Sequence, residues 1–150
     1  MREKVIEFEM FLNRLKILYS VNTIVDFEKK LSVKQWSKKE ILGHLIDSVI
    51  NNIQRLTEIH TFEKPYQIRP YNPDKLVLYN GCQLKNNREL YELWLHLNFH
   101  ILHIIKQQST ESLEFKLVLP DGKIADLQFL IEDYFEHFYY HLKQINPKWT

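Results

Sequence analysis

The stretch WSKKEILGHLIDSVINNIQRL, residues 36–56, contains the best-marked helix start in the chain. Ser37 is a favoured N-cap residue, and Glu40 stands three residues later, where a capping box places its returning carboxylate. Apolar residues then recur every three or four positions, which is the helical period. The stretch therefore predicts a long helix that begins after Ser37 and ends near His60.

Three further segments show the same helical periodicity. They lie at residues 3–19, 87–107 and 127–146. The last of them has Asp126 as a candidate N-cap and Pro147 as its stop. A proline-containing connection, residues 62–84, separates the second and third segments and is too rich in helix breakers for a long helix. The pattern predicts an all-α four-helix bundle, in which the long connection lets the second and third helices run parallel.

Length and composition narrow the possible classes of protein. A chain of 150 residues corresponds to a single domain, here residues 1–150, and its net charge of +1 comes without a dense basic stripe. Nucleic-acid binding is therefore not expected. Cys82 is the only cysteine, which rules out an internal disulfide and leaves a lone thiol without a catalytic context. Charges interrupt the N-terminal apolar residues at every turn, so we expect neither a signal peptide nor a membrane span, and a cytoplasmic location.

Seven histidines are more than packing requires in a chain of this size. His137 and His141 are four residues apart, so a helix places them one above the other on the same face. Two imidazoles presented in this way can reach one metal ion at about 2.1 Å each. Position 138 is Phe rather than Glu, so the zinc-protease motif is absent. An isolated pair of this kind is more often a hydrogen-bonded couple than a metal site.

The third ligand has two candidate sources. On a helical wheel His44 lies nearly opposite the apolar stripe of its helix, which favours a solvent-facing side chain. Less often, a polar helical face of this kind lines a polar cleft. A rival set of histidines forms one stripe on the third predicted helix: His96, His100 and His103. Periodicity alone does not choose between His44 and this stripe.

Two blocks of sequence resemble the DinB-like superfamily. The first is WSKKEILGHLIDS at residues 36–48, followed by Asn51, Asn52 and Arg55. The second is LQFLIEDYFEH at residues 127–137, followed by HLKQI at residues 141–145. The resemblance covers nearly the whole chain, including the spacing between the blocks. It departs at Lys75-Leu76, where related chains often carry an acidic residue and a tryptophan.

The resemblance implies an up-down-down-up bundle with a metal site formed by His44, His137 and His141. The histidines of the third predicted helix then have surface or outer roles. A divalent transition metal, zinc or nickel, is implied, and such a site leaves positions open for water or a thiolate.

Some members of the superfamily are thiol transferases or isomerases that use bacillithiol, mycothiol or glutathione. We therefore expect activation of a low-molecular-weight thiol, or of water, for attack on a small electrophile. Asn51 and Arg55 are candidates for binding this cosubstrate, and Asp47 and Asp133 for orienting ligands. The alternative is a non-catalytic metal-binding module of the stress response. Apolar surfaces on the first and third predicted helices would support a homodimer.

Overall fold

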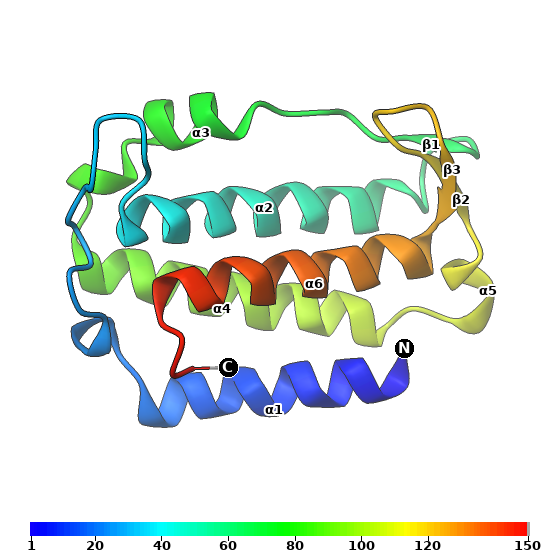
Figure 1. Cartoon of the computed structure of the whole chain (residues 1–150). Coiled ribbons are helices and arrows are strands. Elements are labelled where there is room, and N and C mark those ends of the chain that lie inside the picture. Colours follow the sequence, from blue (N-terminus) through cyan, green and yellow to red (C-terminus); the bar gives the residue numbers. More distant parts are fainter. Residues whose placement is uncertain (150) are drawn as a thin grey trace.

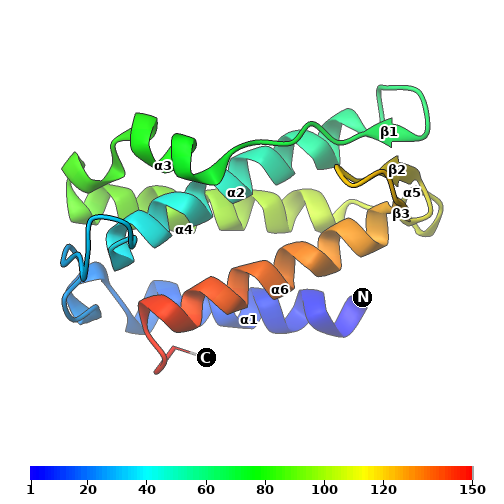
Figure 2. The same cartoon turned by 45° about the horizontal axis from the view of Figure 1, so that its top comes forward.

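The computed structural model describes residues 1–149, and four long helices build it (Figure 1). These are α1 (Arg2–Leu18), α2 (Lys38–Glu58), α4 (Asn87–Lys106) and α6 (Leu127–Ile145). Helices α1 and α6 run in one direction along the bundle, and α2 and α4 run in the other, as Figures 1 and 2 show. The predicted all-α bundle with up-down-down-up order and a parallel α2–α4 pair is confirmed.

The predicted helix starts are present as hydrogen bonds. The Ser37 hydroxyl accepts from the Glu40 amide at 3.0 Å, and the Glu40 carboxylate accepts from the Ser37 amide at 2.8 Å, which completes the capping box. At the start of α6 the Asp126 carboxylate accepts from the Phe129 amide. Each cap satisfies a backbone donor that the first helical turn leaves free.

The connection between α2 and α4 has more structure than its prolines predicted. It contains β1 (Tyr66–Gln67), α3 (Pro73–Asn80) and the 3-10 turn η2 (Cys82–Leu84). Pro73 begins α3 rather than breaking it, because its missing N–H falls at a helix start, where no partner is needed. Asn72 caps this short helix, and Gly81 ends it with a φ of 58°.

A small sheet closes the end of the bundle opposite α3, which the sequence indicated only in part. The strands β1, β2 (Lys116–Val118) and β3 (Ile124–Asp126) lie in that order, with β1 parallel to β2 and β2 antiparallel to β3. The alternating apolar residues of 115–119 are typical of an extended segment, and β2 lies within this stretch. The 3-10 turn η1 (Val21–Thr23) and the short helix α5 (Thr110–Leu113) complete the elements.

Helix α2 lies at the centre of the fold and is enclosed on all sides near its start. Every residue from 42 to 49 is buried. Helices α4 and α6 contact α2, and α3 and η2 also pack against it. Gly43 permits the η2 contact, because a Cβ at this position would lie 2.6 Å from the Cys82 sulfur. The polar face of α2 is therefore an interior surface at this level of the bundle.

The core itself is aromatic where α1, α4 and α6 meet. The rings of Trp94 and Phe138 stack at 5.6 Å, and Phe8 meets Phe138 edge-on at 5.0 Å.

Among residues 1–149, no helix combines the length and the apolar character needed to cross a bilayer.

Candidate metal centre

Three imidazoles from two helices converge on one point between α2 and α6. His44 comes from the second turn of α2, and His137 and His141 come from successive turns of α6. One ring nitrogen from each lies within 4.8 Å of the others. The Nε2 atoms of His44 and His137 are 3.0 Å apart. Two nitrogens that each bind one ion at about 2.1 Å would lie roughly 3 Å apart, so the donor set fits a divalent transition metal.

Burial of this cluster corrects the helical-wheel expectation for His44. Only 5 % of His44 is exposed, although the wheel placed it far from the apolar stripe of α2. Helix α6 covers the side chain from one direction, and the Trp36 ring lies 5.0 Å from the imidazole on another. His137 and His141 are half-buried, at the edge of the core. A polar helical face here lines an internal site rather than solvent.

Neighbouring side chains hold the second nitrogen of two of the imidazoles. The Nδ1 atom of His141 lies 2.9 Å from the Gln144 carbonyl oxygen, which can only accept, so this Nδ1 carries the proton. The Nδ1 atom of His137 lies 3.4 Å from the Ser48 hydroxyl. The buried Nδ1 atom of His44 has no hydrogen-bond partner within residues 1–149. In this arrangement the Nε2 atoms are the ones available as ligands.

The electrostatic surroundings keep the imidazoles neutral near pH 7. Burial, followed by repulsion from the other two histidines, lowers the pKa of His44 to about 4. Burial and repulsion from His141 lower the pKa of His137 to about 4. Burial also lowers the pKa of His141, against the opposing effect of Gln144. Neutral imidazole is the form that binds a metal, so the unprotonated donor set is already in place.

Tyr71 is a residue of this site whose role sequence reasoning missed. Burial raises the pKa of its phenol, and the nearby Ser48 side chain acts in the opposite direction. Its ring also lies 5.6 Å from the Arg55 guanidinium. The only sequence signal was the position of Tyr71 in an aromatic-containing connection. That connection folds back over α2 and brings the ring to the site.

Three of the predicted outer residues lie on α2 and one lies on α6, and their contacts are with groups other than the imidazoles. Asp47 is buried and accepts from the Asn80 amide at 2.6 Å, so it faces α3. Asn51 donates to the Asp47 backbone carbonyl, and Arg55 donates to the Arg69 carbonyl at 3.3 Å. Asp133 is exposed one turn before His137, in the field of Arg55. None of these contacts shows which molecule the four residues would bind.

The rival histidine stripe does not form a site. The side chains of His96, His100 and His103 are all exposed on α4, in agreement with the surface position that the resemblance implies. Within the described part of the chain, the cluster around His44 is the one group of three or more His, Cys, Asp or Glu residues placed to share an ion. Cys82 is buried against Gly43, and burial raises the pKa of its thiol, which disfavours the nucleophilic thiolate.

Comparison with known proteins places the fold. No family model and no curated protein matches the sequence. Solved structures with the same architecture include YfiT from Bacillus subtilis, described as a probable metal-dependent hydrolase with an unusual four-helix bundle topology. It superimposes with a TM-score of 0.80 at 17 % identity, over 97 % of this chain and 83 % of that one. The chain shares the four-helix bundle fold of YfiT.

Another solved structure with this fold, a mycothiol-dependent maleylpyruvate isomerase, is longer. It matches with a TM-score of 0.72 at 13 % identity, over 97 % of this chain. A variant of that isomerase, with one histidine replaced by alanine, matches at 0.71 and 11 % identity. The present chain spans 60 % of the isomerase's length, so it corresponds to only part of that protein. At these identities, the DinB-like resemblance of the two sequence blocks is supported at the level of the fold.

Proposed function

We propose that this chain is a metal-dependent enzyme that activates a low-molecular-weight thiol, or water, for attack on a small electrophile. The proposal rests on one observation: three neutral imidazoles from α2 and α6 present ligand atoms within 4.8 Å of one another. His44, His137 and His141 would hold a divalent transition metal, zinc or nickel. The isomerase with this fold depends on a thiol, and YfiT is described as a probable hydrolase, which supports both choices of nucleophile.

The chain's own residues prepare the site in three ways. The low pKa of His44 and His137 keeps these imidazoles neutral, which is the form that binds a metal ion. Ser48 and Gln144 hold the outer nitrogens of two ligands and so fix the planes of their rings. Trp36 shields one face of His44 from water. A bound divalent ion would lower the pKa of a thiol or water molecule held beside it.

The test compares the parent protein with His137→Ala, both purified without a His-tag and supplied with zinc. Two rates are measured: conjugation of small thiols to 1-chloro-2,4-dinitrobenzene, and hydrolysis of p-nitrophenyl esters. We expect the parent to accelerate one of these reactions and the variant to lose about 100-fold of that rate. His103→Ala, which removes an exposed histidine of α4, is the matched control and should retain full activity.

Two results would contradict the enzymatic proposal. One is a zinc-loaded parent that is no faster than free zinc in buffer with every thiol and ester tried. The other is a His137→Ala variant as active as the parent. The first result, together with tight metal binding, would favour the non-catalytic metal-binding module instead.

Homodimer formation and a cytoplasmic location stay predictions. Helix α1 exposes the apolar side chains of Ile6, Met10 and Ile17, which gives a second copy a surface to cover. Sedimentation equilibrium of the parent and of Met10→Lys measures this: we expect a dimer in the first and a monomer in the second. A parent protein that stays monomeric at all concentrations would contradict the predicted homodimer.

A further inference from the structure

A hollow of about 450 Å³ opens directly over His141. Its volume lies within the range of small-molecule sites, about 300–1,000 Å³. The walls come from four parts of the chain that meet at one end of the bundle (Figure 1): the loop before α2, the first turn of α2, the first turn of α3 and the end of α6. They include Lys34, Trp36, Ile41, Asp74, His141 and Gln144. A molecule in this hollow would touch a proposed metal ligand.

Trp36 gives the hollow a fixed aromatic wall next to the imidazoles. The residue is half-buried, and its ring lies 5.0 Å from that of His44. Its backbone position is held because the next residue, Ser37, caps α2 and also donates to the Gln83 side chain at 2.7 Å. The apolar part of a ligand can therefore pack on a surface that is already in place.

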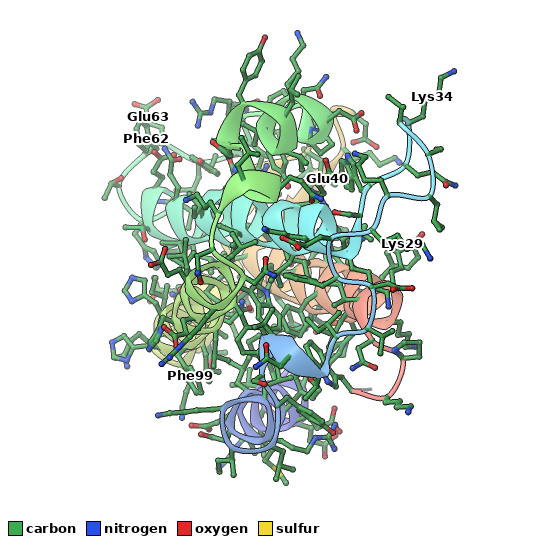
Figure 3. All side chains as sticks on the ribbon, turned by 90° about the vertical axis from the view of Figure 1, so that its left-hand side faces the viewer. Lys29, Lys34, Glu40, Phe62, Glu63 and Phe99 are labelled. Atoms are coloured by element: carbon green, nitrogen blue, oxygen red, sulfur yellow. The ribbon has the colours of Figure 1, made fainter. Side chains whose placement is uncertain are left out.

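Two opposite charges stand on the rim of the hollow without partners. The side chains of Lys34, on the loop before α2, and Asp74, in the first turn of α3, form no ion pair or hydrogen bond with any of residues 1–149. Figure 3 shows Lys34 on the outer turn of its loop, beyond Lys29 and Glu40, with its side chain free in solvent. The neighbouring charges differ, because Lys30 pairs with Glu40 at 2.7 Å. A cation and an anion without protein partners therefore both line the hollow.

We propose that this hollow binds the body of the thiol cosubstrate and selects a zwitterionic thiol, one that carries both a carboxylate and an ammonium group. Lys34 binds the carboxylate, Asp74 binds the ammonium, and the carbon chain packs on Trp36. The inference rests on the proposed function, in which the sulfur is activated at the three imidazoles. It adds the class of thiol and the residues that recognise it.

The test uses three thiols of similar size with the zinc-loaded protein: L-cysteine, cysteamine without the carboxylate, and 3-mercaptopropionate without the ammonium. Affinity is measured by calorimetry. Asp74→Asn should weaken L-cysteine and cysteamine about fivefold and leave 3-mercaptopropionate unchanged, since an exposed ion pair contributes about that factor. Lys34→Gln should weaken L-cysteine and 3-mercaptopropionate by the same factor and leave cysteamine unchanged. Comparing each variant with the parent cancels the different intrinsic reactivities of the three sulfurs.

The intrinsic fluorescence of Trp36 shows whether a thiol binds in the hollow. Of the three tryptophans, Trp94 and Trp149 are fully buried, so acrylamide quenching of tryptophan fluorescence reports Trp36. L-cysteine should protect this fluorescence in the parent. Lys29→Gln, on the same loop but outside the hollow, is the control and should behave like the parent.

Three outcomes would overturn the inference: equal effects of each variant on all three thiols, no effect of either variant, or unchanged quenching of Trp36. Metal-dependent binding with equal effects would leave the proposed function standing. If no thiol binds through the metal, S-methyl-L-cysteine tests the hollow alone. If S-methyl-L-cysteine protects Trp36 from quenching, and the protection is lost in the Asp74 and Lys34 variants, the binding role of the hollow is supported even without thiol activation. If it gives no protection, the inference is overturned.

Discussion

At the scale of single residues, the outer nitrogens of the three imidazoles are held to different degrees. Gln144 accepts from His141 over 2.9 Å, the contact between Ser48 and His137 is longer at 3.4 Å, and His44 has no outer partner among residues 1–149. Such outer contacts fix ring orientation and raise ligand basicity. His141 is therefore the best-oriented ligand of the three.

This difference predicts the effect of removing one outer contact. Gln144→Ala should weaken zinc affinity about tenfold, because the His141 ring loses the acceptor that holds its Nδ1 proton. Competition with a chromophoric chelator measures the affinity. Gln128→Ala is the matched control, since Gln128 bonds only to Glu132 at the far end of the same helix. Equal affinities for the parent and Gln144→Ala would show that this contact does not orient the ligand.

Acid should destabilise the metal-free protein through the same histidines. The folded-state pKa of His44 and of His137 is about 4, below the ordinary value of 6.5. Between these values the unfolded chain binds more protons than the folded chain, so stability is full above pH 6.5 and falls as the pH drops toward 4. Urea unfolding at pH 7.5 and pH 5 should differ by on the order of 2 kcal/mol for each group.

The variant His137→Gln isolates the contribution of one imidazole to this pH dependence. It removes one titrating group and lessens the repulsion on His44, so the loss of stability between pH 7.5 and pH 5 should shrink. A variant with the same pH dependence as the parent would assign the acid sensitivity to other groups.

At the scale of elements, the fully buried Lys39 joins three parts of the chain around the start of α2. Its ammonium donates to the backbone carbonyls of Gln83 and Lys85 at 2.9 Å and 2.7 Å and pairs with Glu28 at 2.8 Å. These contacts tie the loop before α2 and the segment after α3 to the helix that carries His44. The frame of the metal centre thus depends on one buried cation.

Lys39→Met keeps the length of this side chain and removes its charge. Because two backbone carbonyls and one carboxylate lose the buried donor that they share, we expect the free energy of unfolding to fall by about 2–4 kcal/mol. Chemical denaturation measures the change. Lys38→Met is the adjacent control, since Lys38 makes a single exposed contact with the Val25 carbonyl and should lose less than about 1 kcal/mol. Equal losses of unfolding free energy in the two variants would show that the buried contacts of Lys39 do not stabilise the fold.

The element boundaries show which structural information is local in the sequence. The starts of α2 and α6 were predictable, because each cap forms between residues three apart. Helix α3 was missed because proline was read as a breaker, whereas at a first helical position it is tolerated. Strand β1 is only two residues long and pairs with β2, far away in sequence, so no local pattern predicts it. Strand β3 pairs with the nearby β2 across a turn, but its three residues are too few to show an alternating pattern.

At the scale of the whole molecule, the burial of His44 is a tertiary property that periodicity cannot reveal. The helical wheel places it on a polar face, and the packing of α6 and of the Trp36 ring against that face buries it. The pair His137 and His141 was predictable from spacing within one helix. Its partner on α2 came from the resemblance to the DinB-like superfamily, and Tyr71 came only from the structure.

The central claim is that His44, His137 and His141 bind one metal ion together. Element-resolved metal analysis of untagged protein, after dialysis against metal-free buffer, tests it most directly. We expect the parent protein and His100→Ala to retain about one equivalent of a divalent transition metal, and His44→Ala and His137→Ala to retain no metal. A parent that retains no metal when zinc and nickel are supplied, or His44→Ala and His137→Ala variants that retain a full equivalent, would contradict it.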